Sequence, residues 1–185
     1  MSADVPAAPP RPTLVLPVPG ARLRPWQSSD ATALARHGND RSIWLNLRDR
    51  FPHPYSVADA EEYIAFVTSE EGHRDLHLCV EVDGEAVGTI SLLFKQDVSR
   101  RSAEVGYWLG RAHWGQGIAT AAVCNLVDYG FAHYDLARIY ALVFSHNAAS
   151  GRVLEKASFT FEARLRQAVT KDGQTMDGLL YALVR

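Results

Sequence analysis

Residues 76 to 109 contain three consecutive stretches in which apolar and polar residues alternate with the two-residue period of a β-strand. The first stretch, LHLCVEV, is followed by Asp83-Gly84, a dipeptide typical of a two-residue hairpin turn, and then by EAVGTISLLF. The third stretch, SAEVGYWLG, follows a polar loop. Because such short links join only antiparallel neighbours, this segment predicts an antiparallel meander.

After the meander, the sequence alternates between helix and strand patterns. We expect a helix from about Gly117 to Tyr134, a strand at ARIYALVF, a short helix at NAASGRVLEKA, and two last strands joined through residues 171–173. A strand reached through a helix must cross over, which favours one parallel pair. We therefore predict an α+β fold, a mixed and mostly antiparallel twisted sheet of about six or seven strands with helices on both faces.

The region before the meander predicts one short strand and three helices. ARLRPW is the strand, SSDATALARHG and NDRSIWLNL are short helices, and residues 56–69 form an amphipathic helix that Ser56 and Asp59 cap after the rigid turn FPHPYS. Residues 1–19 hold six of the nine prolines and no long apolar run. We expect a disordered arm over residues 1–19 and a single domain over residues 20–185, with no signal peptide or membrane span.

The distribution of charge along the chain gives no sign of a polyanionic partner. Its 19 basic and 21 acidic residues are well mixed and give a net charge of −2, so we expect neither nucleic acid nor a membrane surface as partner. The two cysteines, Cys79 and Cys124, make no metal-binding spacing. We interpret both as reduced thiols in a cytoplasmic protein, and we expect no metal site.

The segment HWGQGIAT, residues 113–120, places two glycines where a helix begins. The first amides of a helix lack partners and lie at its positive end, so Gly115 and Gly117 can leave room there for a phosphate. The alternative is that the two glycines only allow a tight turn and bind no phosphate. A dinucleotide fingerprint would need a glycine or alanine where Thr120 stands, and a nucleotide P-loop would need a lysine that the segment lacks.

Two motifs resemble one family. AEVGYWLGRAHWGQGIATAAV is similar to the acetyl-coenzyme A segment of the GNAT N-acetyltransferases, in particular the RimJ/RimL-type subgroup, and FSHNAASGRVLEKASF is similar to the subgroup's second motif. Two positions depart from the family patterns: Trp114 replaces a polar residue, as is common in the subgroup, and Ser158 replaces a glycine. The likeness covers roughly residues 20–185. It implies the GNAT fold, in which a bulge in GYWLG splays this strand from ARIYALV.

The resemblance also implies a donor site. Acetyl-coenzyme A would lie in the opening between the splayed strands, with its pyrophosphate on the amides of residues 115–120. The residues implied in binding it are Tyr107, Trp108, Leu109, Arg111, Trp114, Gly115, Gln116, Gly117, Ile118, Ala119, Thr120, Asn147, Ser150, Arg152 and Lys156. For the basic residues of this set, plain solubility is the alternative.

Three residues are implied in the chemistry. Glu104 would accept the proton of the amine through water, and a backbone amide, that of Leu109, would hold the oxyanion. The family's usual tyrosine is missing from the second motif, so Ser150 takes the place of the acid. The alternatives are that Glu104 is solvated or paired with a nearby arginine, Arg100 or Arg101, and that Asn147 and Ser150 only cap their helix.

The acceptor side is less constrained. Trp44, Phe51, Tyr55 and Trp108 could line its pocket, with core packing as the equal alternative. Asp49 and Asp177 are candidate anchors for an amine. The leading hypothesis is an N-acetyltransferase acting on a primary amine, either a protein N-terminus or a small molecule. The alternative is a non-catalytic acyl-coenzyme A sensor on the same fold. The oligomeric state, a homodimer included, stays open.

Overall fold

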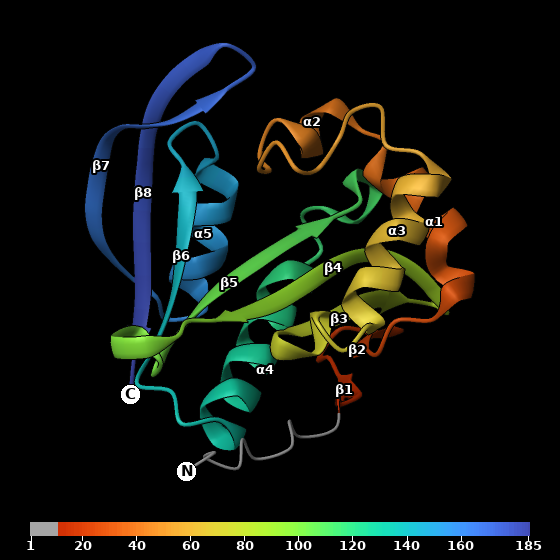
Figure 1. Cartoon of the computed structure of the whole chain (residues 1–185), viewed down its shortest axis with the longest axis horizontal. Helices are drawn as coiled ribbons and strands as arrows, with labels where there is room; N and C mark the ends of the chain where they lie inside the picture. Colours follow the sequence, from red (N-terminus) through yellow and green to blue (C-terminus); the bar gives the residue numbers. More distant parts are fainter. Residues whose placement is uncertain (1–10) are drawn as a thin grey trace.

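A mixed sheet forms the centre of the computed structural model, which describes residues 11–185 (Figure 1). Within these residues the sheet has eight strands in the order β1-β2-β3-β4-β5-β6-β8-β7, and only β5 and β6 are parallel neighbours. The strands are β1 Leu14–Val15, β2 Ala21–Arg24, β3 Leu76–Val82, β4 Glu85–Phe94, β5 Ser102–Leu109, β6 Arg138–Phe144, β7 Thr160–Lys171 and β8 Gln174–Val184. The predicted meander and parallel pair are confirmed.

Helices cover both faces of the sheet (Figure 1). They are α1 Ala31–Gly38, α2 Arg41–Trp44, α3 Val57–Thr68, α4 Ile118–His133 and α5 Ala148–Lys156. α3 begins at the predicted capping box of Ser56 and Asp59. One apolar cluster joins α4 and α5 to the sheet, and a second packs α1 and α3 on the opposite face. The α+β prediction is therefore confirmed. No helix in residues 11–185 combines the length and apolar character that a membrane span requires.

The predicted disordered arm is wrong for residues 11–19. Leu14–Val15 pairs with β2, Leu16 is 4% exposed, and the Arg11 guanidinium donates to the backbone oxygen of Gly72 at 3.1 Å. The prolines masked the short apolar pattern TLVLPV, although proline is tolerated at the edge of a sheet, where the ladder needs fewer donors. Residues 1–10 lie outside the described part of the chain.

The two parallel strands separate soon after they meet. β5 and β6 pair only from Ser102↔Arg138 to Glu104↔Tyr140, after which β5 follows β4 and β6 follows β8. Figure 1 shows the V that results. The expected bulge is wrong, because the register between β4 and β5 runs unbroken from Phe94↔Ala103 to Gly88↔Leu109. Each strand keeps its outer partner while the sheet twists, and this twist separates the two inner edges.

Candidate active site

The inner edges of the V carry backbone groups that no neighbouring strand uses. In the β4–β5 ladder, Lys95 N donates to Ser102 O at one end and Gly110 N to Val87 O at the other. Because hydrogen-bonded pairs alternate with non-bonded pairs, Tyr107 and Leu109 turn their N–H and C=O groups away from β4 and toward the V.

The same alternation applies to β6. Ser145 N donates to Asp177 O in the β6–β8 ladder, so Leu142 and Phe144 occupy the alternate positions and turn their backbone groups toward β5. The V is thus a slot with free peptide groups on both walls. An extended ligand that carries amides can bind there as an added strand.

The glycine loop lies at the end of β5, where α4 begins. Gly115 and Gly117 have φ angles of +76° and +80°, and a Cβ at either position would meet no heavy atom within 4 Å. The first intrahelical bond of α4 runs from Ala121 N to Gly117 O, which leaves the amides of residues 118–120 without helical partners. This open, positive helix start can hold a phosphate.

Trp114 ties the glycine loop to β5. Its indole N–H donates to the backbone oxygen of Leu109 at 2.6 Å, while the residue as a whole is 45% exposed. This bond leaves the N–H of Leu109 as the group that faces the V. Gln116 bonds back to Ala112 O at 2.9 Å, so its side chain also shapes the loop. Arg111 is exposed just before the loop.

On the α4 and α5 side of the V, the hydroxyl groups of Tyr107 and Ser150 lie 2.8 Å apart. Ser150 is in the first turn of α5, and its amide donates to the side chain of Asn147 at 3.1 Å, so the expected capping role is confirmed. Burial raises the pKa of Tyr107 to about 12 against the opposing effect of the Ser150 bond. Arg152 and Lys156 are exposed further along α5.

Glu104 lies where the two strands part, on the opposite face. Its carboxylate is 11% exposed and pairs with Arg48 and, at 3.1 Å, with Lys95. The alternative of a pair with Arg100 or Arg101 is wrong, and Arg101 pairs with Asp135 instead. Lys95 could have been found from the sequence, since Leu93↔Glu104 in the hairpin register places Lys95 diagonally opposite on the same face.

A cavity of about 260 Å³ lies beside the V, between β6, β7 and the segment after α2. Its lining residues are Leu47, Arg48, Asp49, Leu142, Phe144, Ala168, Val169, Thr170 and Lys171. Of the sequence candidates, only Asp49 lines it. The sequence did not reveal the others, because their approach depends on the path of the long loop between α2 and α3, although the charged run Arg48-Asp49-Arg50 beside aromatic residues was a usable signal. We name this cavity the acceptor pocket.

The aromatic candidates fall into two places. Phe51 stacks on Tyr55 with ring centres 4.4 Å apart and meets Trp108 edge-on at 5.6 Å, and Tyr55 is only 5% exposed. Burial also raises the pKa of Tyr55. These facts favour core packing for Tyr55. The ring of Trp44 instead faces the ammonium of Lys171, which lies 3.8 Å from the ring centre.

Asp49 and Asp177 are already engaged by cations. Lys171, with a side chain only 2% exposed, donates to Asp49 at 2.8 Å. Asp177 pairs with Arg164 and accepts from the amide of Gln167 at 2.8 Å, which pins the bulge of β7. Asp177 therefore has a structural explanation and lies outside the set that lines the acceptor pocket.

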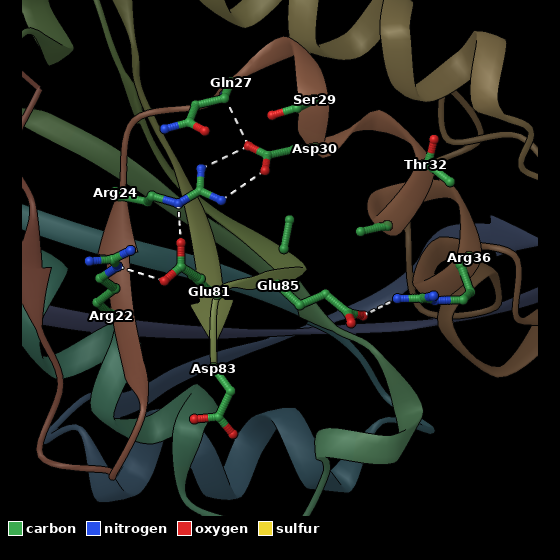
Figure 2. Close-up of a pocket in the computed structure, with 13 residues that line it drawn as sticks. Arg22, Arg24, Gln27, Ser29, Asp30, Thr32, Arg36, Glu81, Asp83 and Glu85 are labelled. Atoms are coloured by element: carbon green, nitrogen blue, oxygen red, sulfur yellow. Dashed lines mark hydrogen bonds and ion pairs between the residues drawn. The ribbon is translucent and has the colours of Figure 1, made fainter.

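A larger groove of about 650 Å³ lies away from the V, along β2, α1 and the β3–β4 hairpin (Figure 2). Figure 2 shows the buried guanidinium of Arg24 between the carboxylates of Asp30 and Glu81, with bonds of 2.7 and 2.8 Å to Asp30. Because the buried charges pair with one another, none of Arg24, Asp30 and Glu81 is free for chemistry. The ion pairs of Arg24 join β2, β3 and the start of α1.

Replacing Arg24 by leucine is expected to lower the free energy of unfolding by about 3–5 kcal/mol, because the buried carboxylate of Asp30 loses its cation and that of Glu81 keeps only Arg22. Arg36→Gln, which breaks an exposed pair with Glu85, is the control and should cost under about 1 kcal/mol. Urea denaturation measures both. Equal effects would contradict a dominant role of the buried pairs.

The cost of Arg24→Leu should also depend on pH. Burial alone would raise the pKa of Glu81, but bonds from Arg22 and Arg24 outweigh it and the net pKa is below the usual 4.5. Such a carboxylate stabilises the fold above pH 4.5, and this contribution is lost as pH falls through the folded pKa. Wild type and Arg24→Leu should therefore converge in stability in acid, as urea denaturation at graded pH would measure.

The V can be reached from two faces of the sheet. The Tyr107–Ser150 pair lies on the α4 and α5 side, and Glu104 and Arg48 lie on the side of α1–α3. The V is a slot for an extended arm that carries amides, and it ends at a helix start that can hold a phosphate. This combination suits an acyl-coenzyme A donor, and the other face leaves room for an acceptor. Fold and site together define an acyl-coenzyme A-dependent transferase.

The comparisons with known proteins specify the family. Residues 21–160 match the family described as Acetyltransferase (GNAT) domain, so the chain belongs to the GNAT acetyltransferases and is an acetyl-coenzyme A-dependent N-acetyltransferase. The N-acetyltransferase p20 of Bacillus licheniformis is 32% identical over 88% of this chain and 92% of its own length. Spermidine N(1)-acetyltransferase of Escherichia coli K12 is 28% identical over 83% of this chain and 80% of its own.

Solved structures agree with the resemblance seen in the sequence. RimJ of Mycobacterium smegmatis, in complex with a coenzyme A disulfide, is 30% identical with a TM-score of 0.79, covering 94% of this chain and 86% of that one. RimL, a ribosomal L7/L12 α-N-protein acetyltransferase solved with coenzyme A, is 21% identical with a TM-score of 0.81 over 94% and 98%. The RimL likeness bears on the fold alone.

Proposed function

We propose that this protein transfers an acetyl group directly from acetyl-coenzyme A to the α-amine at the end of a peptide or to a small primary amine. The main support for this proposal is the V. Its walls offer free backbone groups to a donor that enters from one face, and the acceptor pocket opens on the other face. The glycine loop supports the donor's place, because residues 118–120 present unpartnered amides in open space.

In this proposal the backbone groups of Tyr107 hold the pantetheine arm, the N–H of Leu109 faces the thioester carbonyl of the same donor, and the amides after Gly117 hold the pyrophosphate. Arg111, just before the glycine loop, and Arg152 and Lys156 on α5 are exposed, and in this proposal they supply positive charge to the phosphates. Asn147 has its amide nitrogen left to donate, because only its oxygen caps α5.

The chemistry follows from the two faces. Glu104 takes the proton from the attacking amine through water as the new C–N bond forms, and the N–H of Leu109 stabilises the oxyanion. As the C–S bond breaks, Ser150 donates a hydrogen bond to the thiolate, which then takes up a proton. Tyr107 stays protonated because of its raised pKa, so it can donate to Ser150 and leave the serine's own proton free for sulfur.

Tyr107→Phe is expected to lower kcat about tenfold, the value of one hydrogen bond of about 1.4 kcal/mol. Ser150→Ala should lose a similar amount, and the double variant should lose little more, because both changes remove the same interaction. Steady-state kinetics with saturating acetyl-coenzyme A measure this. Tyr63→Phe, which removes a buried bond to Thr89 at 2.8 Å away from the V, is the control. Additive losses would contradict the coupling.

Thiol release from acetyl-coenzyme A in the presence of a panel of amines tests the function itself. The panel holds peptides with free N-termini, spermidine and amino acids, and the product is identified by mass spectrometry. Transfer to at least one amine is expected. Tight binding of acetyl-coenzyme A with no transfer to any amine would instead support a non-catalytic sensor.

A further inference from the structure

The charges around the acceptor pocket are unbalanced toward the positive. The residues that line it include two cations, Arg48 and Lys171, and one carboxylate, Asp49. Glu104 adjoins the pocket through its pair with Arg48, and Lys95 pairs with Glu104 in turn. Both carboxylates are already paired, since Asp49 accepts from Lys171 and Glu104 from the other two cations. The pocket therefore offers no unpaired carboxylate of this group to a second ammonium of an acceptor.

Arg48 has unused binding capacity. Its side chain is 55% exposed, and within residues 11–185 its only bond runs from Nη2 to Glu104. The remaining guanidinium donors have the planar fork that suits a carboxylate. Lys171 differs, because it is buried, bonded to Asp49 and covered by the ring of Trp44. Of the cations that line the pocket, Arg48 is thus the one available to an incoming anion.

The size of the pocket limits what enters. About 260 Å³ is below the range of about 300–1,000 Å³ typical of sites for drug-sized ligands, so the pocket takes the end of a chain or a very small molecule. An amine that enters this pocket places its nearest neighbouring groups beside Arg48 at the exposed rim.

We propose that Arg48 selects acceptors that carry a carboxylate close to the primary amine, such as a peptide whose second or third residue is acidic, over polyamines. This inference rests on the proposed acetyl transfer and names its acceptor class.

The test compares Arg48→Gln with Arg50→Gln. Arg50 is exposed on the same segment and does not line the pocket, so the two variants lose the same charge two residues apart. The acceptors are matched peptides that begin with Ser-Asp or Ser-Asn, free aspartate and asparagine, and spermidine. The peptide and amino-acid pairs distinguish the two sources of a nearby carboxylate.

For wild type and Arg50→Gln, kcat/KM is expected to be about tenfold higher for the acidic member of a pair, the value of one exposed charge-assisted bond. Arg48→Gln should abolish this preference, through a rise in KM for the acidic member of each pair. Arg48→Lys should restore part of the preference. A structural effect of Arg48 would instead lower activity toward all acceptors alike.

The outcomes distinguish a failure of this inference from a failure of the proposed acetyl transfer. Equal preference in Arg48→Gln and Arg50→Gln, or a wild-type preference for spermidine, would overturn the role of Arg48 while acetyl transfer stands. Absence of thiol release with every acceptor, despite binding of acetyl-coenzyme A, would overturn the transferase function and the inference with it.

Discussion

Glu104→Gln should lower kcat by about 100- to 1,000-fold, in the range expected when a general base is removed. Glutamine keeps the shape of the side chain, and its single oxygen can still accept from one of the two cations, Arg48 or Lys95, so the fold and the pocket should persist. It cannot take the proton that the amine must lose as the C–N bond forms. The loss should therefore appear in kcat, and the affinity for acetyl-coenzyme A should change little.

Glu162→Gln is the matched control. Glu162 is also a strand carboxylate paired with an arginine, Arg138, but it lies on the outer strand β7 away from the V. Steady-state kinetics, calorimetric titration with coenzyme A and thermal unfolding should be measured for both variants. If Glu104→Gln loses no more turnover than Glu162→Gln, the proton leaves by another route and Glu104 is only an ion-pair partner.

The order of the elements could be predicted because each depends on a local pattern. The alternation in residues 76–109, the Asp83-Gly84 turn and the Ser56 cap act within a few residues, and all appear in the structure. The position of Ser158 also follows a local rule, since its φ of +66° is the left-handed conformation for which the family pattern has glycine. The short strand β1 was not predicted, because its apolar pattern is interrupted by proline.

The partners of the site residues could not be predicted in the same way. The bond from Tyr107 to Ser150 joins residues 43 apart, and the pair of Arg48 with Glu104 joins residues 56 apart. Such contacts depend on how far β5 and β6 diverge and on the path of the loop after α2, which no local pattern sets. For this reason Glu104 could be proposed from the sequence, but Arg48, one of the two cations that pair with it, could not.

Gly117→Val should raise the dissociation constant of coenzyme A at least about 100-fold. Gly117 has a φ of +80° at the start of α4, a conformation that a β-branched residue avoids. Its side chain would also occupy the open space before the amides of residues 118–120. Losing two charge-assisted bonds of about 1.5 kcal/mol each gives a change of this size. Calorimetric titration measures it.

Gly84→Val separates strain from binding. Gly84 has a φ of +86°, its Cβ would also meet no atom within 4 Å, and it lies in the β3–β4 turn away from the V. Both variants should lose comparable thermal stability, and only Gly117→Val should lose affinity for coenzyme A. Pantetheine lacks the pyrophosphate, so its weaker binding should be the same in wild type and in Gly117→Val. If pantetheine binding fell equally, the substitution would have disturbed the V itself, and the glycine loop could not be assigned to the phosphates.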